Sequence, residues 1–161
     1  MKGKISFYCR VLHVSRQAFI KYLKTKDAPW KYQALADAID DPAHAGSKRQ
    51  IDIDKGLHEQ TVGLGAEESG KIKGPITRDP SGKAEFFDVH GQAWDVKSFN
   101  SSYKPKQGGF ALPSAMRSIN KSLSEGEFVI LDTTNLNIQH LSDLLEELKR
   151  QNLMDKIILW P

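Results

Sequence analysis

The stretch "AEFFDVHGQAWDVKSF" at positions 84–99 determines the fold that we predict for this chain. They indicate two short strands, "KAEFFDV" and "AWDVKSF", joined by a tight turn at His90-Gly91-Gln92. Glu85 and Asp88 lie on the first strand, and Asp95 and Lys97 lie on the second. A plain hairpin needs polar residues on its solvent face, but it does not need three acids and a lysine gathered in this way. The hairpin therefore predicts a functional site.

The spacing of these residues indicates a metal site. Residues two apart in a strand point to the same face, so Asp95 and Lys97 share one, and pairing of the strands can bring Glu85 beside Asp95. Adjacent carboxylates repel each other unless a cation lies between them. Mg²⁺ prefers such oxygen ligands, and we also consider Mn²⁺ and Zn²⁺. A register shifted by one step would instead make Asp88 the ligand.

A lysine beside such a metal has a defined chemical use. Lys97 can orient or deprotonate an attacking water, or stabilise negative charge on a phosphate. The constellation of Glu85, Asp95 and Lys97 therefore predicts hydrolysis of a phosphodiester.

The chain from residue 51 to residue 161 predicts an α/β (α+β) domain with the element order α-β-β-β-α-β-α-β. The predicted helices are "IDIDKGLHEQTVGLGAEES", "SAMRSINKSLSEG" and "IQHLSDLLEELKRQ". Pro75 and Pro80 place the first extended segment at a sheet edge or in a loop. The buried strand "EFVILDTTNL" and the closing "DKIILWP" complete the set.

Two further groups of residues are candidates for contact with nucleic acid. Lys104 and Lys106 lie in the long loop "NSSYKPKQGGFALP", after the hairpin, where they can reach phosphates. Thr133 and Thr134 follow a buried strand at its carboxyl end, where α/β proteins often place ligands.

Charge divides the chain into two parts. Residues 1–50 carry ten Lys and Arg against four acids, whereas residues 51–161 carry thirteen against sixteen. The basic part favours contact with nucleic acid, and "DDPAHAGSKRQ" (residues 40–50) is a candidate linker. The single cysteine, Cys9, indicates a reduced compartment, and no signal peptide or transmembrane segment is predicted. We expect a cytoplasmic site of action, no contact with membranes, and no particular oligomeric state.

The hairpin resembles the PD-(D/E)xK nucleases. In "AEFFDVHGQAWDVK", Glu85 stands where that family has its first acid, and Asp95-Val96-Lys97 matches the acid-x-Lys element. Ala84 and Glu85 depart from the family's usual Pro and Asp. The resemblance implies an αβββαβ restriction-endonuclease-like core with a mixed sheet. It also implies a third acid on the first helix, for which Glu59 is the candidate metal ligand.

A second resemblance covers about residues 59–161. The phrases "GKIKGPITR", "AEFFD", "GQAWDVKSFNS", "GGF", "VILDTTNL" and "IILWP" resemble C-terminal toxin domains of bacterial polymorphic-toxin and contact-dependent inhibition systems. This resemblance implies a toxin that cleaves DNA or RNA and is neutralised by a cognate immunity protein.

The first 40 residues have a different resemblance. "KISFYCRVLHVSRQAFIKYLK", continued by "APWKYQALADAI", is similar to the N-terminal helix-turn-helix of IS3-family transposases. It implies either a DNA-binding segment or a fusion remnant that packs as a helical hairpin. Residues 1–50 are thus a helix-turn-helix-like segment with its linker, and residues 51–161 are the nuclease-like domain.

Two alternatives to a metal-dependent nuclease stay open. A metal-independent ribonuclease toxin would cleave tRNA through attack by a 2′-hydroxyl, with His58, His90, Lys97 and Thr134 as candidate acid–base residues. A DNA-binding or interaction protein would use the helix-turn-helix and carry a degenerate nuclease fold.

Overall fold

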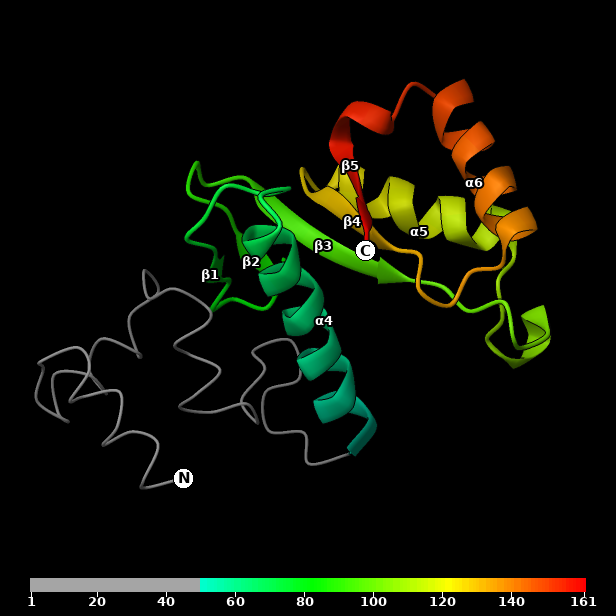
Figure 1. Ribbon diagram of the computed structural model, residues 1–161, viewed down its shortest axis with the longest axis horizontal. Helices are drawn as coiled ribbons and strands as arrows, with labels where there is room; N and C mark the ends of the chain where they lie inside the picture. Colours follow the sequence, from blue (N-terminus) through cyan, green and yellow to red (C-terminus); the bar gives the residue numbers. More distant parts are fainter. Residues whose placement is uncertain (1–49) are drawn as a thin grey trace, which may run out of the picture.

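A five-stranded mixed sheet in the order β1-β2-β3-β4-β5 forms the centre of the molecule (Figure 1). The strands are β1 (Thr77–Arg78), β2 (Phe86–Phe87), β3 (Ala93–Ser98), β4 (Phe128–Asp132) and β5 (Ile157–Trp160). In β1, β2 and β3 each strand is antiparallel to its neighbour, and β4 and β5 continue parallel to β3. This computed structural model describes residues 50–161, so the predicted helix-turn-helix segment and Cys9 lie outside the described residues.

Within residues 50–161, three α-helices accompany the sheet: α4 (Gln50–Glu68), α5 (Leu112–Ser124) and α6 (Ile138–Arg150). Short 3₁₀ turns, η2 (Pro105–Gln107) and η3 (Met154–Lys156), interrupt the connections. The predicted order α-β-β-β-α-β-α-β and the α/β class with a mixed sheet are thus confirmed. No helix among the described residues combines the length and the apolar character needed to cross a membrane.

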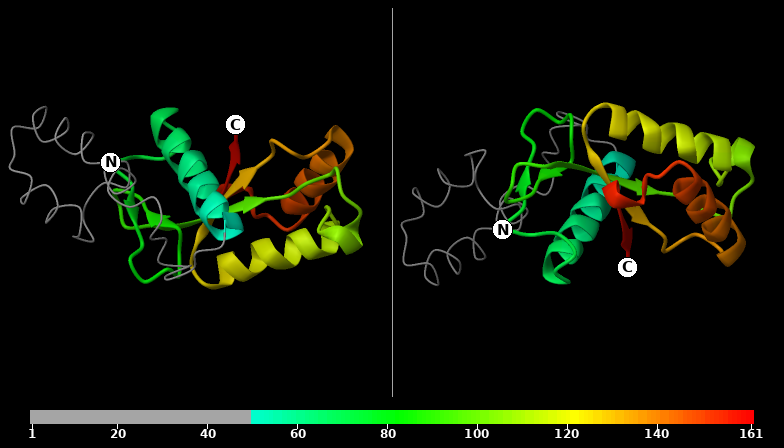
Figure 2. Two further views of the ribbon diagram at one scale, coloured as in Figure 1. Left: turned by 90° about the horizontal axis from the view of Figure 1, so that it is seen from below. Right: turned by 90° about the horizontal axis from the view of Figure 1, so that it is seen from above.

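The helices cover the two faces of the sheet unequally. Helix α4 packs on one face, and α5 and α6 pack on the other (Figure 2). The α4 side buries Val62 and Ala66 of the helix with Phe86, Trp94, Val96, Ile72, Ile76 and Ile130. The α5–α6 side buries Val129 and Leu131 of β4 among helix residues that include Ile119, Leu144 and Leu148. Alternation along β4 therefore supplies both cores, whereas β3 gives Trp94 and Val96 to the α4 side.

Helix α4 forms although its sequence contains three glycines, which lower helix propensity. Gly65 has a packing reason, because a Cβ at this position would overlap the indole ring of Trp160. Trp160 packs against the α4-side core, and Lys71 Nζ lies 5.6 Å from the centre of its ring. The glycine thus lets the helix approach the end of β5 closely.

The hairpin is shorter than its sequence predicts, because Asp88 ends β2 and builds the turn. Its Oδ1 accepts the N–H groups of His90 and Gln92 at 2.8 and 3.0 Å, and its Oδ2 accepts the Trp94 indole N–H at 3.2 Å. Both carboxylate oxygens are therefore engaged in the turn. Asp88, the alternative ligand to Glu85, thus lies in the turn, and the observed register pairs Phe86 with Trp94.

We expect Gly65→Ala to lower the free energy of unfolding by about 1–3 kcal/mol, because the added methyl group overlaps the ring of Trp160. Helix propensity alone would raise it by about 1 kcal/mol. Urea denaturation measures the change. In the double variant Gly65→Ala/Trp160→Leu the loss should shrink, and strict additivity of the two substitutions would contradict the proposed contact.

Candidate active site

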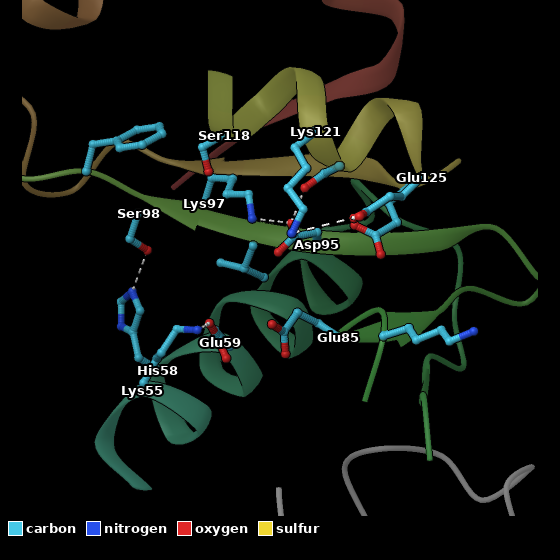
Figure 3. A pocket seen from close by; sticks show the side chains of 15 residues that line it. Lys55, His58, Glu59, Glu85, Asp95, Lys97, Ser98, Ser118, Lys121 and Glu125 are labelled. Carbon is cyan, nitrogen blue, oxygen red and sulfur yellow. Dashed lines mark hydrogen bonds and ion pairs between the residues drawn. The ribbon is translucent and has the colours of Figure 1, made fainter. Parts of the chain in front are cut away.

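A pocket of about 470 Å³ lies at the edge of β3, between α4 and α5 (Figure 3). It exists because β2 pairs with β3 only at Ala93 and Trp94, so the edge of β3 beyond Trp94 faces the pocket. Four separate segments contribute to its walls: α4, the loop before β2, β3 with the residues after it, and α5 with the residues that lead into β4. All four predicted catalytic residues, Glu59, Glu85, Asp95 and Lys97, line this pocket.

Glu85 directly precedes β2 and reaches the pocket from there. Phe86 pairs with Trp94, and the Glu85 N–H also donates to the Trp94 carbonyl at 3.0 Å, so Glu85 faces Trp94 and the regular ladder ends at this point. The side chains of Glu85 and Asp95 both line the pocket, and Figure 3 shows Glu85 on the α4 side, near Glu59.

Asp95 and Lys97 lie on the face that α5 covers. Their parallel partners in β4 are Val129 and Leu131, which belong to the core on that side. Asp95 is only 8% exposed, and its Oδ2 accepts hydrogen bonds from the ammonium of Lys97 and the hydroxyl of Ser122. The carboxylate is thus held in place from its own strand and from α5.

Glu59 reaches the same pocket from the opposite face, because α4 passes the open edge of β3 (Figure 3). It is buried, and its Oε1 lies 3.1 Å from the ammonium of Lys55, one turn earlier on the helix. Burial lowers the pKa of Lys55, but the carboxylates of Glu59, Glu85 and Asp95 outweigh burial and hold this pKa above its ordinary value. Three acids thus act on one cation.

Several pocket residues were missed by the sequence prediction. Ser122 and the buried Glu127 lie on the α5 side, and Lys121 and Glu125 form an exposed pair at 3.8 Å. Burial raises the pKa of Glu127, and the negative charges of Asp95 and Glu125 raise it further. Lys55 and Lys121 had a signal in the sequence, since a Lys and a Glu four residues apart on a helix lie side by side.

A second polar cluster lies at one end of the pocket and connects α4 with β3 and β4. His58 Nε2 lies 2.7 Å from Asp132 Oδ2 and 3.2 Å from Ser98 Oγ, and the Ser98 hydroxyl donates to the same Asp132 oxygen at 3.0 Å. Asp132 is 1% exposed. Burial raises its pKa, but hydrogen bonds from Thr134, His58 and Ser98 outweigh burial and keep this pKa below its ordinary value.

Other candidates lie away from the pocket walls. Thr133 ties β4 to β5, since its hydroxyl donates to the Trp160 carbonyl at 2.9 Å, and the Thr134 hydroxyl donates to Asp132 at 2.6 Å. Lys104 and Lys106 are exposed around η2, and His90 is exposed in the turn before β3. None of these five residues lines the pocket. Their proposed contacts with nucleic acid or substrate stay predictions.

The donor set suits a hard divalent cation. Glu85 and Asp95, with Glu59, supply the carboxylate oxygens that Mg²⁺ and Mn²⁺ prefer, and Lys55 already places a positive charge among them. As the side chains stand, no group of three or more His, Cys, Asp or Glu residues within the range 50–161 has the geometry of a metal site. Comparisons with family models, with curated proteins and with solved structures give no match.

Asp79 positions the loop that carries Glu85. Its carboxylate accepts the N–H groups of Ser81 and Ala84 at 2.8 and 3.0 Å and the Ser81 hydroxyl at 2.8 Å. Burial raises the pKa of Asp79, but these hydrogen bonds outweigh burial and hold this pKa below its ordinary value. The loop is thus fixed by a carboxylate that has to stay ionised.

This arrangement predicts a pH dependence of stability. Because the pKa of Asp79 is lower in the folded than in the unfolded chain, its contribution is complete above the unfolded value of about 3.9 and is lost as the pH falls through the folded value. We expect Asp79→Asn to cost about 1–2 kcal/mol at neutral pH and to lose less stability than the wild type on acidification. Urea denaturation at several pH values measures this. The exposed Asp155→Asn is the control, and parallel curves for Asp79→Asn and the wild type would contradict the assignment.

Proposed function

We propose that the domain is a metal-dependent nuclease that hydrolyses phosphodiester bonds of DNA or RNA. One observation carries the proposal: Glu59, Glu85, Asp95 and Lys97 come from three separate segments and line one pocket. The order of α4, the three antiparallel strands, α5 and the parallel β4 is the αβββαβ arrangement that the resemblance to PD-(D/E)xK nucleases implies. The restriction-endonuclease-like assignment of this core is part of the proposal.

In the proposed mechanism Glu85 and Asp95, with Glu59, would hold Mg²⁺ or a similar ion in the pocket. Such an ion, when bound, polarises the phosphate and favours ionisation of a water. Lys97 orients the attacking water or takes its proton, or stabilises charge on the phosphate. The water oxygen bonds to phosphorus, one P–O ester bond breaks, and the leaving oxygen takes up a proton.

The same resemblances support a role as a bacterial toxin domain. A cognate immunity protein would then be its partner, and it would act by covering the pocket between α4 and α5. Nucleic acid is the substrate in this proposal.

Substitution of the central pair tests the mechanism. We expect Asp95→Asn and Lys97→Met each to reduce cleavage of plasmid DNA or total tRNA in Mg²⁺ buffer by at least about 100-fold. The reason is that Asp95 is a proposed ligand and Lys97 serves the water. Lys149→Met, on the exposed side of α6, is the control and should keep wild-type activity. Wild-type cleavage rates for Asp95→Asn or Lys97→Met, with folding verified by circular dichroism, would refute the mechanism.

A second candidate is a metal-independent ribonuclease, and the His58–Asp132 pair favours it. A buried carboxylate fixes the imidazole in the pocket that Lys97 also lines. In that reaction a base takes the proton of the 2′-hydroxyl, whose oxygen attacks the adjacent phosphorus, and the 5′-oxygen leaves with a proton from an acid. His58 and Lys97 are the candidates in the pocket for these two proton transfers.

The two candidates differ in their response to EDTA. For the metal-dependent nuclease, EDTA abolishes cleavage and His58→Ala leaves the Mg²⁺-dependent rate within about tenfold of the wild type. For the metal-independent ribonuclease, cleavage is confined to RNA, is unchanged in EDTA, and falls by at least about 100-fold in His58→Ala. Gel assays on plasmid DNA and tRNA, each with and without EDTA, decide between them.

A further inference from the structure

Lys55 is a charged pocket residue to which the proposed mechanism gives no role. It lies one helical turn before Glu59 on α4, and its ammonium is 3.1 Å from Glu59 Oε1. Figure 3 shows Lys55 and Glu59 on the lower wall of the pocket, facing the part of β3 that carries Asp95. The lysine therefore puts its charge where the proposed metal ligands converge.

We propose that Lys55 is a built-in cation that occupies the position of the divalent metal and has to leave when the metal binds. This inference rests on the proposed metal-dependent function. It adds a residue that sets the affinity of the site for its metal.

Electrostatics around the pocket supports this role. The carboxylates that raise the pKa of Lys55 are Glu59, Glu85 and Asp95, the same three acids that are proposed to hold the metal. Closely spaced carboxylates repel one another, so a positive charge among them stabilises the metal-free fold. A divalent ion would supply that charge instead, and two cations in the same small space would repel each other.

Lys55 differs from the second lysine of the pocket in its freedom to leave. Its side chain is 58% exposed, whereas the side chain of Lys97 is 23% exposed and bonds to Asp95 on its own strand. The long stem of Lys55 starts on the surface of α4 and can turn its ammonium towards water. Lys97 can therefore keep its place beside Asp95 while Lys55 yields to the metal.

Isothermal titration calorimetry of the full chain with Mn²⁺ tests the inference. Lys55→Met keeps the length of the side chain and removes its charge, and we expect it to bind Mn²⁺ about tenfold more tightly than the wild type. Lys121→Met is the matched control, because Lys121 is also a pocket lysine paired with a Glu four residues on, but at 3.8 Å. We expect Lys121→Met to change the affinity for Mn²⁺ clearly less than Lys55→Met does.

Thermal unfolding gives a second readout that does not depend on activity. In EDTA, Lys55→Met should melt at a lower temperature than the wild type, because three acids lose their shared cation. Addition of Mn²⁺ should raise its melting temperature by more than it raises that of the wild type.

The outcomes separate this inference from the proposed function. If the wild type binds Mn²⁺ and Lys55→Met binds it equally or more weakly, Lys55 is not a competitor, and the metal site stands without it. If Lys55→Met and Lys121→Met gained the same affinity for Mn²⁺, the loss of any positive charge in the pocket would explain the effect. That result would overturn the inference. If neither the wild type nor Lys55→Met binds Mn²⁺, both the metal-dependent function and the inference fail.

Discussion

The pairing of Phe86 with Trp94 across β2 and β3 is the contact on which the site depends. The two rings stack with their planes 9° apart and their centroids 6.5 Å apart, and Phe86 is completely buried under α4. Because side chains alternate along a strand, burial of Trp94 on one face sends Asp95 to the other, and Glu85, the residue before Phe86, reaches the same pocket. A slip of one residue would expose the rings and turn Asp95 away from the face that it now occupies. Apolar packing thus sets the geometry of a charged site.

The short length of β2 matters as much as its register. The turn built by Asp88 on one side and the loop held by Asp79 on the other leave room for only two paired residues. The edge of β3 beyond Trp94 therefore faces the pocket, and side chains of α4 and α5 meet around it although these helices cover opposite faces of the sheet. If β2 were longer, its backbone would pair with this open edge of β3. It would then fill part of the space between Glu59 and Asp95.

The sequence predicted those parts of the structure that depend on local pattern. Helical and strand periodicity gave the element order, and Glu85, Asp95 and Lys97 of the predicted hairpin line one pocket. It missed Ser122, Glu127 and the His58–Asp132 pair, because each contact joins elements more than 20 residues apart whose meeting depends on how the helices dock. It also gave β2 too many residues, because the hydrogen bonds that make Asp88 a turn residue depend on the backbone of the folded hairpin. Glu59 was placed in the site by resemblance, since a glutamate on a helix carries no signal of its own.

The pocket gathers more charge than stability alone would favour. Asp95, Glu59 and Glu127 are each less than 9% exposed, and removing a carboxylate from water costs several kcal/mol unless partners compensate for it. Lys97, Lys55 and Ser122 provide that compensation, each from a different position on the wall. Apolar side chains of similar volume would fill the same space at no such cost, as they do in the two cores on either side of the sheet. The charge therefore supports the proposed function, in which a fold that already holds acids and lysines side by side would exchange one cation for another without rebuilding its walls.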